Sequence, residues 1–206
     1  QAEDGIRDLV RSRGLGDVYK RQVIYVTNGF MQEEPLREIA PFLDAANVDV
    51  KGFSQDFYKK IAQADLQRVK DNCVLMKELG LHVELTYLVI PTLNDNGQIE
   101  AFSKWVVEDM GEDTAIHFSR FHPDFKLGHL PSTPLETLVK ARETAMECGA
   151  RFVYIGNAPQ LKMEDTFCPQ CKEKVLERNF FTTKNRLKSK RCPSCGTCIP
   201  IVTQIR

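Results

Sequence analysis

Four cysteines near the C-terminal end constrain this chain more than any other feature of its sequence. Cys168-Pro-Gln-Cys171 and Cys192-Pro-Ser-Cys195 are CxxC motifs separated by 20 residues, which is the spacing of four-cysteine zinc sites. Each tight turn offers two thiolates at one corner, and two such corners complete a tetrahedron. The spacing predicts structural zinc, with iron, an iron–sulfur cluster or disulfides as alternatives. Cys198 is expected to be a spare cysteine.

The remaining composition describes a globular chain without an export signal. Hydrophobic residues make up 42% and charged residues 27% of the sequence, and the longest strongly apolar run, 85–90, is too short to span a bilayer. The odd number of cysteines, seven, argues against a disulfide framework. Cys73 and Cys148 are expected to be buried thiols in helices. We therefore expect a soluble cytoplasmic protein with no membrane partner.

Strands alternate with amphipathic helices from residue 23 onward, which predicts an α/β fold with a parallel sheet. Strands are predicted at 23–26, 47–51, 82–90, 115–118 and 152–155, and helices at 35–46, 66–79, 99–110 and 135–148. Right-handed crossovers bring the C-terminal ends of all the strands to one rim, where chemistry gathers. The predicted organisation is a leader over 1–22, an α/β domain over 23–160 and a zinc ribbon over 161–206.

The leader does not join this alternation. Residues 1–22 contain five basic residues and three glycines and offer little core. The stretch 5–22 looks like translated sequencing-adapter read-through, and a native basic helix or tail is the alternative. In both cases the leader is excluded from the fold.

Polar residues at the predicted strand ends are the candidate binding site. Asp49 and Lys51 lie two residues apart in a strand, so their side chains point to one face. An inward carboxylate and ammonium are costly unless they are paired or bound to a ligand, and an internal salt bridge is the structural alternative. His117 faces inward by the same alternation, although a satisfied core histidine is more usual. Thr27-Asn28-Gly29 follows the first strand.

With these pieces placed, the chain from residue 23 onward resembles radical S-adenosylmethionine (SAM) enzymes related to pyruvate formate-lyase activating enzyme. Within that group it looks most like the radical SAM enzyme of the AmmeMemoRadiSam system. The matching segments, in the order of the family, are Tyr25-Val-Thr-Asn-Gly29, Asp49-Val-Lys51-Gly52, Val83-Glu-Leu-Thr-Tyr-Leu-Val-Ile-Pro91 with Asn94-Asp95, Ile116-His-Phe-Ser-Arg-Phe-His-Pro123, Val153-Tyr-Ile-Gly-Asn157 and the two CxxC motifs.

The resemblance implies a partial (β/α) barrel, made of the later strands only, with a small C-terminal zinc ribbon. It implies that SAM binds at the C-terminal ends of the strands, and that the family's [4Fe–4S] cluster cleaves SAM reductively to a 5′-deoxyadenosyl radical. The residues that would surround SAM are Thr27, Asn28, Gly29, Asp49, Lys51 and His117. Memo-family and AMMECR-family proteins are the implied partners.

One departure from the family pattern is large. The family holds its cluster with CxxxCxxC after the first barrel strand, and this spacing does not occur in the chain. The chain is therefore predicted to be a C-terminal fragment that does not cleave SAM by itself.

Two other interpretations remain open. The first is a zinc-ribbon module that binds a protein or RNA through the basic run 184–191, which is otherwise read as a solvated loop. The balance of 28 basic and 28 acidic residues gives no general basic field, so nucleic-acid binding is not the main expectation. The second is a metal-dependent lyase on a TIM barrel with His117, Asp49 and Lys51 as acid–base residues.

Overall fold

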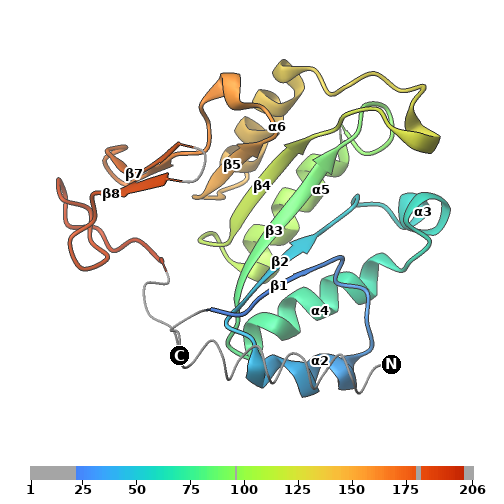
Figure 1. The fold of residues 1–206 in the computed structure, drawn as a ribbon, viewed down its shortest axis with the longest axis horizontal. Helices are drawn as coiled ribbons and strands as arrows, with labels where there is room; N and C mark the ends of the chain where they lie inside the picture. Colours follow the sequence, from blue (N-terminus) through green and yellow to red (C-terminus); the bar gives the residue numbers. More distant parts are fainter. Residues whose placement is uncertain (1–21, 96, 180–181, 202–206) are drawn as a thin grey trace. The chain divides into compact units, whose positions relative to one another are not determined.

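A computed structural model describes residues 22–95, 97–179 and 182–201 (Figure 1). The predicted leader lies outside the described residues except for Gln22. The chain divides into two compact units, whose described parts are 22–86 and 87–201. The strands of the main sheet follow the order β1-β2-β3-β4-β5. Within the described residues, no helix has the length and apolar character needed to cross a membrane.

The first unit contains parallel strands covered by helices. Strand β1 pairs in parallel with β2, and β2 pairs in parallel with the first half of β3. The elements are β1 (Ile24–Thr27), α2 (Glu33–Ile39), the 3₁₀ helix η1 (Ala40–Phe42), β2 (Ala45–Asp49), α3 (Gln55–Phe57), the π-helix η2 (Tyr58–Ala62), α4 (Leu66–Glu78) and β3 (His82–Val89).

Helix α4 forms where its residue spacing predicts it. The Asp65 side chain accepts a hydrogen bond from the N–H of Arg68 (2.9 Å) and so caps the N-terminus. Val69, Cys73 and Met76 are fully buried on one face, as predicted by their helical spacing. Gly80, with φ +84°, ends the helix in the left-handed conformation.

The segment between α2 and β2 corrects two predicted boundaries. The helix predicted over 35–46 is α2 followed by η1, because Pro41 has no N–H to continue the α-helical ladder. The strand predicted over 47–51 is β2, two residues earlier. Val48 and Val50 are both buried, so the apolar alternation continues beyond the paired residues.

The second unit begins within β3 and contains β4 paired in parallel with β5. Its elements are α5 (Gly97–Trp105), the π-helix η3 (Val106–Met110), β4 (Ala115–Arg120), η4 (Phe125–Leu127), α6 (Leu135–Glu147), β5 (Val153–Gly156), η5 (Pro159–Leu161), β6 (Thr166–Phe167), β7 (Lys174–Asn179) and β8 (Thr182–Asn185). The ring centroids of Tyr87 and Phe102 are 4.9 Å apart in its core. Cys148 is half-buried, less buried than predicted.

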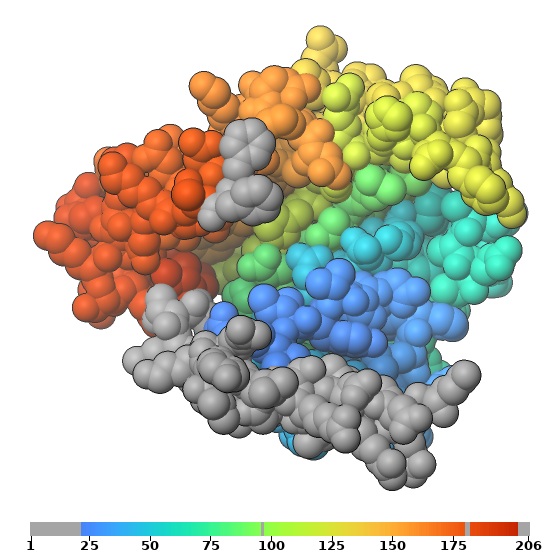
Figure 2. Space-filling model, viewed as in Figure 1, coloured from blue at the N-terminus to red at the C-terminus, as the bar shows by residue number. Residues whose placement is uncertain are grey.

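Residues 166–201 form a small ribbon around an antiparallel sheet, β6-β7-β8. The ribbon shares a hydrophobic cluster with the starts of β4 and β5. Ala115 and Phe152 pack in this cluster with Val175, Ile199 and the cysteines Cys168 and Cys192. Figure 2 shows the orange side chains that follow β5 against the red-orange ones of the ribbon. The predicted C-terminal module is therefore packed on the strands that precede it.

Candidate functional site

The four cysteines of the two CxxC motifs converge on one point. Their Sγ atoms all lie within 4.8 Å of one another. The Sγ atoms of Cys168 and Cys195 are 3.5 Å apart, and those of Cys171 and Cys192 are 3.6 Å apart. Cys168 and Cys192 are buried, while Cys171 and Cys195 are exposed. The predicted metal ligands are thus brought together from opposite ends of the ribbon.

The two motifs share one backbone design. The N–H of Lys172 donates to the carbonyl of Cys168 (3.0 Å), and the N–H of Gly196 donates to the carbonyl of Cys192 (2.9 Å). Lys172 and Gly196 both have a left-handed backbone, with φ of +61° and +76°. Each turn therefore folds its two thiols to the same side.

The arrangement suits a tetrahedral ion. With metal–sulfur bonds of about 2.3 Å, a tetrahedron has sulfur–sulfur edges of about 3.8 Å, close to the two observed pairs. Disulfide sulfurs would be about 2.05 Å apart. The four thiols could hold zinc or iron in a closed site, and such a site has no open position for a substrate.

The thiols differ in how readily they ionise. Hydrogen bonds from the hydroxyl and the backbone N–H of Thr197 lower the pKa of Cys195 to about 6. At Cys171 the N–H of Glu173 acts in the same direction, but hydrogen bonds with the other thiols and desolvation outweigh it and raise the pKa to about 12. Because a metal binds thiolates, protons compete with it, and its affinity should fall as the pH falls.

Asp49 and Lys51 form the polar pair predicted at the end of the second strand. The Nζ of Lys51 lies 2.9 Å from Oδ2 of Asp49, which confirms that the two side chains share a face. The salt bridge considered as the structural alternative is therefore formed, but its side chains are 36% and 41% exposed. An ion pair this exposed contributes at most about 1 kcal/mol. A ligand could therefore replace either partner at small cost.

The neighbouring polar residues on this face were missed by the sequence analysis. Asn47 lies in register with Glu84, and Asp49 with Thr86, so all four side chains share one face of β2 and β3. The Thr86 hydroxyl donates to Oδ1 of Asn47 (2.9 Å). The sequence of β3 contains the pattern that predicts this face, because the buried Val83 and Leu85 alternate with polar residues.

The Thr27-Asn28-Gly29 turn is shaped by local hydrogen bonds. The Thr27 hydroxyl accepts from the N–H of Gly29 (3.1 Å), and Oδ1 of Asn28 accepts from the N–H of Phe30 (3.0 Å). Thr27 is in register with Val48, so its side chain lies on the face opposite to Asp49. The structure therefore does not bring Thr27 together with the Asp49–Lys51 pair.

A buried tyrosine supports the backbone beneath the pair. The hydroxyl of Tyr58, in η2, accepts a hydrogen bond from the N–H of Lys51 (3.2 Å). Burial raises the pKa of this phenol to about 12, so the residue stays neutral and holds the chain where β2 ends.

His117 belongs to the second unit and lies, as predicted, on the face of β4 opposite to Ile116 and Phe118. Ile116 and Phe118 are fully buried on the other face of β4, while the His117 ring stacks on Tyr154 of β5, with centroids 5.1 Å apart. Its assignment to a site with Asp49 remains a prediction.

Comparison with known proteins places these features in context. No family model matches the chain. An uncharacterized protein of Methanocaldococcus jannaschii is 44% identical over 183 residues, which cover 87% of this chain and 54% of that protein. The chain thus spans about half the length of the curated relative it matches.

Among solved structures, the chain is similar to a domain of pyruvate-formate lyase-activating enzyme from Bacteroides vulgatus. The TM-score is 0.58 with 14% sequence identity, over 72% of this chain and 93% of that domain. This likeness shows the fold. The five-stranded α/β sheet predicted from the sequence is therefore confirmed, while the barrel remains a prediction.

Proposed function

We propose that this chain is the C-terminal part of a radical SAM enzyme related to pyruvate formate-lyase activating enzymes, and that it binds SAM. One observation carries the proposal: a half-exposed Asp49–Lys51 pair lies at the C-terminal end of a parallel strand, within a fold similar to an activating-enzyme domain. In sheets of this kind, ligands bind beyond the carboxyl ends of the strands.

The chemistry of the pair matches the methionine moiety of SAM. That moiety carries an α-carboxylate, which the Lys51 ammonium complements, and an α-ammonium group, which the Asp49 carboxylate complements. Asn47 and Thr86 add hydrogen-bonding groups on the same face, suitable for ribose hydroxyls. His117, in the second unit, is a further SAM contact that the resemblance predicts.

The proposal separates the two metal centres. A [4Fe–4S] cluster supplies the electron for SAM cleavage in this enzyme class, and the residues present do not include its CxxxCxxC ligands. The four cysteines of the ribbon form a closed structural site instead. In the complete protein the cluster ligands come from outside this chain, and partners of the Memo and AMMECR families belong to the same proposal.

Binding of SAM to the purified chain tests this proposal by calorimetry. We expect one SAM per chain, competition by S-adenosylhomocysteine, and affinity about tenfold weaker in Asp49→Asn and Lys51→Met, because each loses a charged contact. Asp56→Asn and Lys60→Met are matched controls, since they break another Asp–Lys pair (3.1 Å) that is exposed on a helix. Equal affinity in the site and control variants would refute the assignment.

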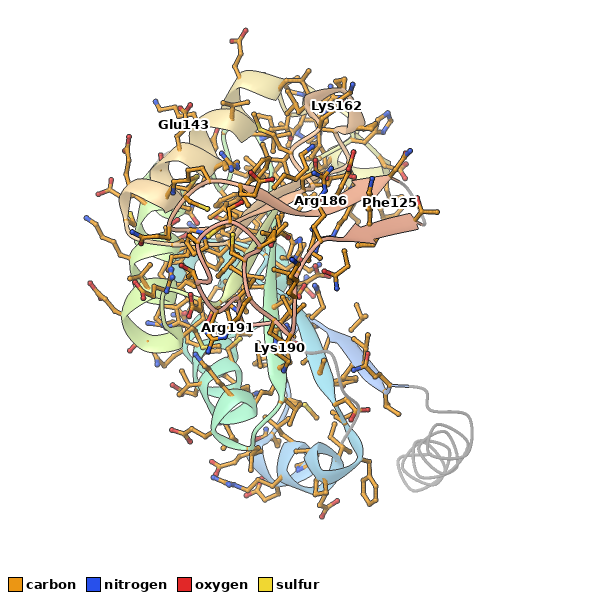
Figure 3. The ribbon with its side chains drawn as sticks, turned by 90° about the vertical axis from the view of Figure 1, so that its left-hand side faces the viewer. Phe125, Glu143, Lys162, Arg186, Lys190 and Arg191 are labelled. Atoms are coloured by element: carbon orange, nitrogen blue, oxygen red, sulfur yellow. The ribbon has the colours of Figure 1, made fainter. Side chains whose placement is uncertain are left out.

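A second candidate function rests on the charge of the ribbon. Residues 182–191 contain five basic residues and no acidic ones, and all five are exposed. Arg186, Lys190 and Arg191 mark this run in Figure 3. It could bind RNA, in which case the affinity for labelled single-stranded RNA would fall steeply with salt and drop in a Lys184, Lys188 and Lys190 to Gln variant. Salt-independent affinity, or none, would exclude it.

A further inference from the structure

The ring of His117 is held by a contact that continues into the ribbon. His117 and Tyr154 are register partners on β4 and β5, and their rings are stacked at 25° with centroids 5.1 Å apart. Both side chains are half-buried. The neighbours of His117 in the strand are fixed in the core, and the stacked Tyr154 ring is placed to set the plane of the His117 ring.

Tyr154 is in turn held by the ribbon. The guanidinium carbon of Arg178, in β7, lies 5.2 Å from the centroid of the Tyr154 ring, within the range of a cation–π interaction. The Tyr154 hydroxyl is 2.9 Å from Oγ1 of Thr166, in β6. The ring is therefore fixed at its π-system and at its hydroxyl by two strands of the ribbon.

Arg178 is itself placed by several hydrogen bonds. Its Nη1 donates to Oγ1 of Thr166 and to the carbonyl of Glu164, both at 2.8 Å. Its backbone N–H donates to Oδ1 of Asp165 at 2.7 Å. Although the residue is exposed, its guanidinium has a defined position over the tyrosine.

This contact network lies next to the four-cysteine site. Thr166 is two residues before Cys168 and pairs with Leu176 of β7. Cys168 and Cys192 belong to the same hydrophobic cluster as Phe152, two residues before Tyr154. The ion that closes the four-cysteine site would therefore hold in place the strands that position Arg178 and Thr166.

We propose that Tyr154 and Arg178 are positioning residues, through which the metal-loaded ribbon sets the orientation of the His117 ring. The effect of this contact on SAM binding rests on the proposed function, in which His117 is assigned to SAM. It gives the ribbon a role in the binding site without placing any ribbon residue on the ligand. Breaking this chain of contacts is expected to weaken SAM affinity about fivefold.

The test reads His117 directly by NMR of the metal-loaded chain. The chain has four histidines, and His117→Gln assigns the resonance. We expect Arg178→Gln and Tyr154→Leu to shift the His117 ring signals, with bound metal unchanged, and chelation of the metal to shift them too. Tyr154→Phe keeps the ring and the cation–π contact and should restore most of the wild-type signal.

The matched control is Arg186→Gln, which removes the same charge from the same ribbon. Arg186 pairs with Glu177 (2.8 Å), so His117 should not respond. An unmoved His117 signal in Arg178→Gln and after chelation would overturn the inference.

Titration of the same samples with SAM separates the two claims. Weaker binding in Arg178→Gln, together with a shifted His117 signal, supports both. If the wild-type chain binds no SAM while its His117 signal still responds to Arg178→Gln, the proposed function fails and the positioning contact stands.

Discussion

Two glycines, one after β1 and one after the second CxxC motif, have a left-handed backbone. Gly29 has φ +72°, and a Cβ there would lie 2.9 Å from Cγ1 of Val48 and 3.1 Å from Cγ1 of Val69. Gly196 has φ +76°, but a Cβ there would meet no atom within 4 Å. The backbone of Gly29 therefore passes close to α4, which is a packing reason for glycine at this position, while its role in binding SAM remains a prediction.

Replacement of each glycine by alanine should lower the free energy of unfolding by a different amount. Gly196→Ala should lower the free energy of unfolding by about 1–2 kcal/mol, the cost of a left-handed backbone. Gly29→Ala adds overpacking against two valines and should cost about 2–5 kcal/mol. Urea unfolding of the metal-loaded proteins measures both, and equal losses would contradict the close approach at Gly29.

At the scale of elements, long periodic segments were predictable and short irregular ones were not. Helix α4 has an apolar period, an Asp cap and a terminal glycine, and its predicted bounds differ by one residue from the observed ones. The α3–η2 segment was missed because it is short and partly π-helical. The segment is too short to show a helical spacing of apolar residues, although it contains Tyr58, which bonds to the end of β2.

The candidate site was predictable to the same degree. The alternation of side chains in a strand was sufficient to predict that Asp49 lies beside Lys51. The spacing of the two CxxC motifs was sufficient to predict that the four cysteines converge. The register between β2 and β3 adds Asn47 and Thr86 to the face, and that register depends on the pairing of distant segments, which no local pattern contains. The same holds for the contact between Tyr154 and Arg178.

The η2 element makes a prediction about alkaline pH. Below pH 10, Tyr58 is protonated in both the folded and unfolded states. Above pH 10 the unfolded state loses its proton first, because burial raises the folded-state pKa to about 12, so stability falls as the pH rises. This contribution should be about 1 kcal/mol by pH 11.

Comparison of wild type with Tyr58→Phe by urea unfolding at pH 8, 10 and 11 isolates this contribution. The variant loses the hydrogen bond to Lys51 at every pH, so its stability starts lower, but its decline above pH 10 should be shallower. Parallel declines would contradict the neutral, buried phenol.

At the scale of the whole molecule, the metal should stabilise the ribbon and leave the first unit folded. Few buried residues form the ribbon's core, and two of them, Cys168 and Cys192, belong to the four-cysteine group. Chelation should therefore raise amide hydrogen exchange over 166–199 while β1, β2 and α4 stay protected. Protection unchanged over 166–199 after complete metal removal would contradict a structural role.

Metal analysis of two serine variants refines this prediction. Cys168→Ser should lose the single bound ion, because its Sγ belongs to the converging group. Cys198→Ser should keep it, because Cys198 is outside that group and exposed. Loss of metal in Cys198→Ser would reassign the fourth ligand.

The central claim is that this chain is the SAM-binding, cluster-lacking part of a larger radical SAM enzyme. The direct test is an anaerobic assay for 5′-deoxyadenosine with iron, sulfide, a reductant and SAM. It compares this chain with the full-length Methanocaldococcus jannaschii relative, of which the matching segment is 54%. The account predicts product from the relative and none from this chain. Product from this chain alone, or none from the relative after reconstitution with iron and sulfide, would contradict it.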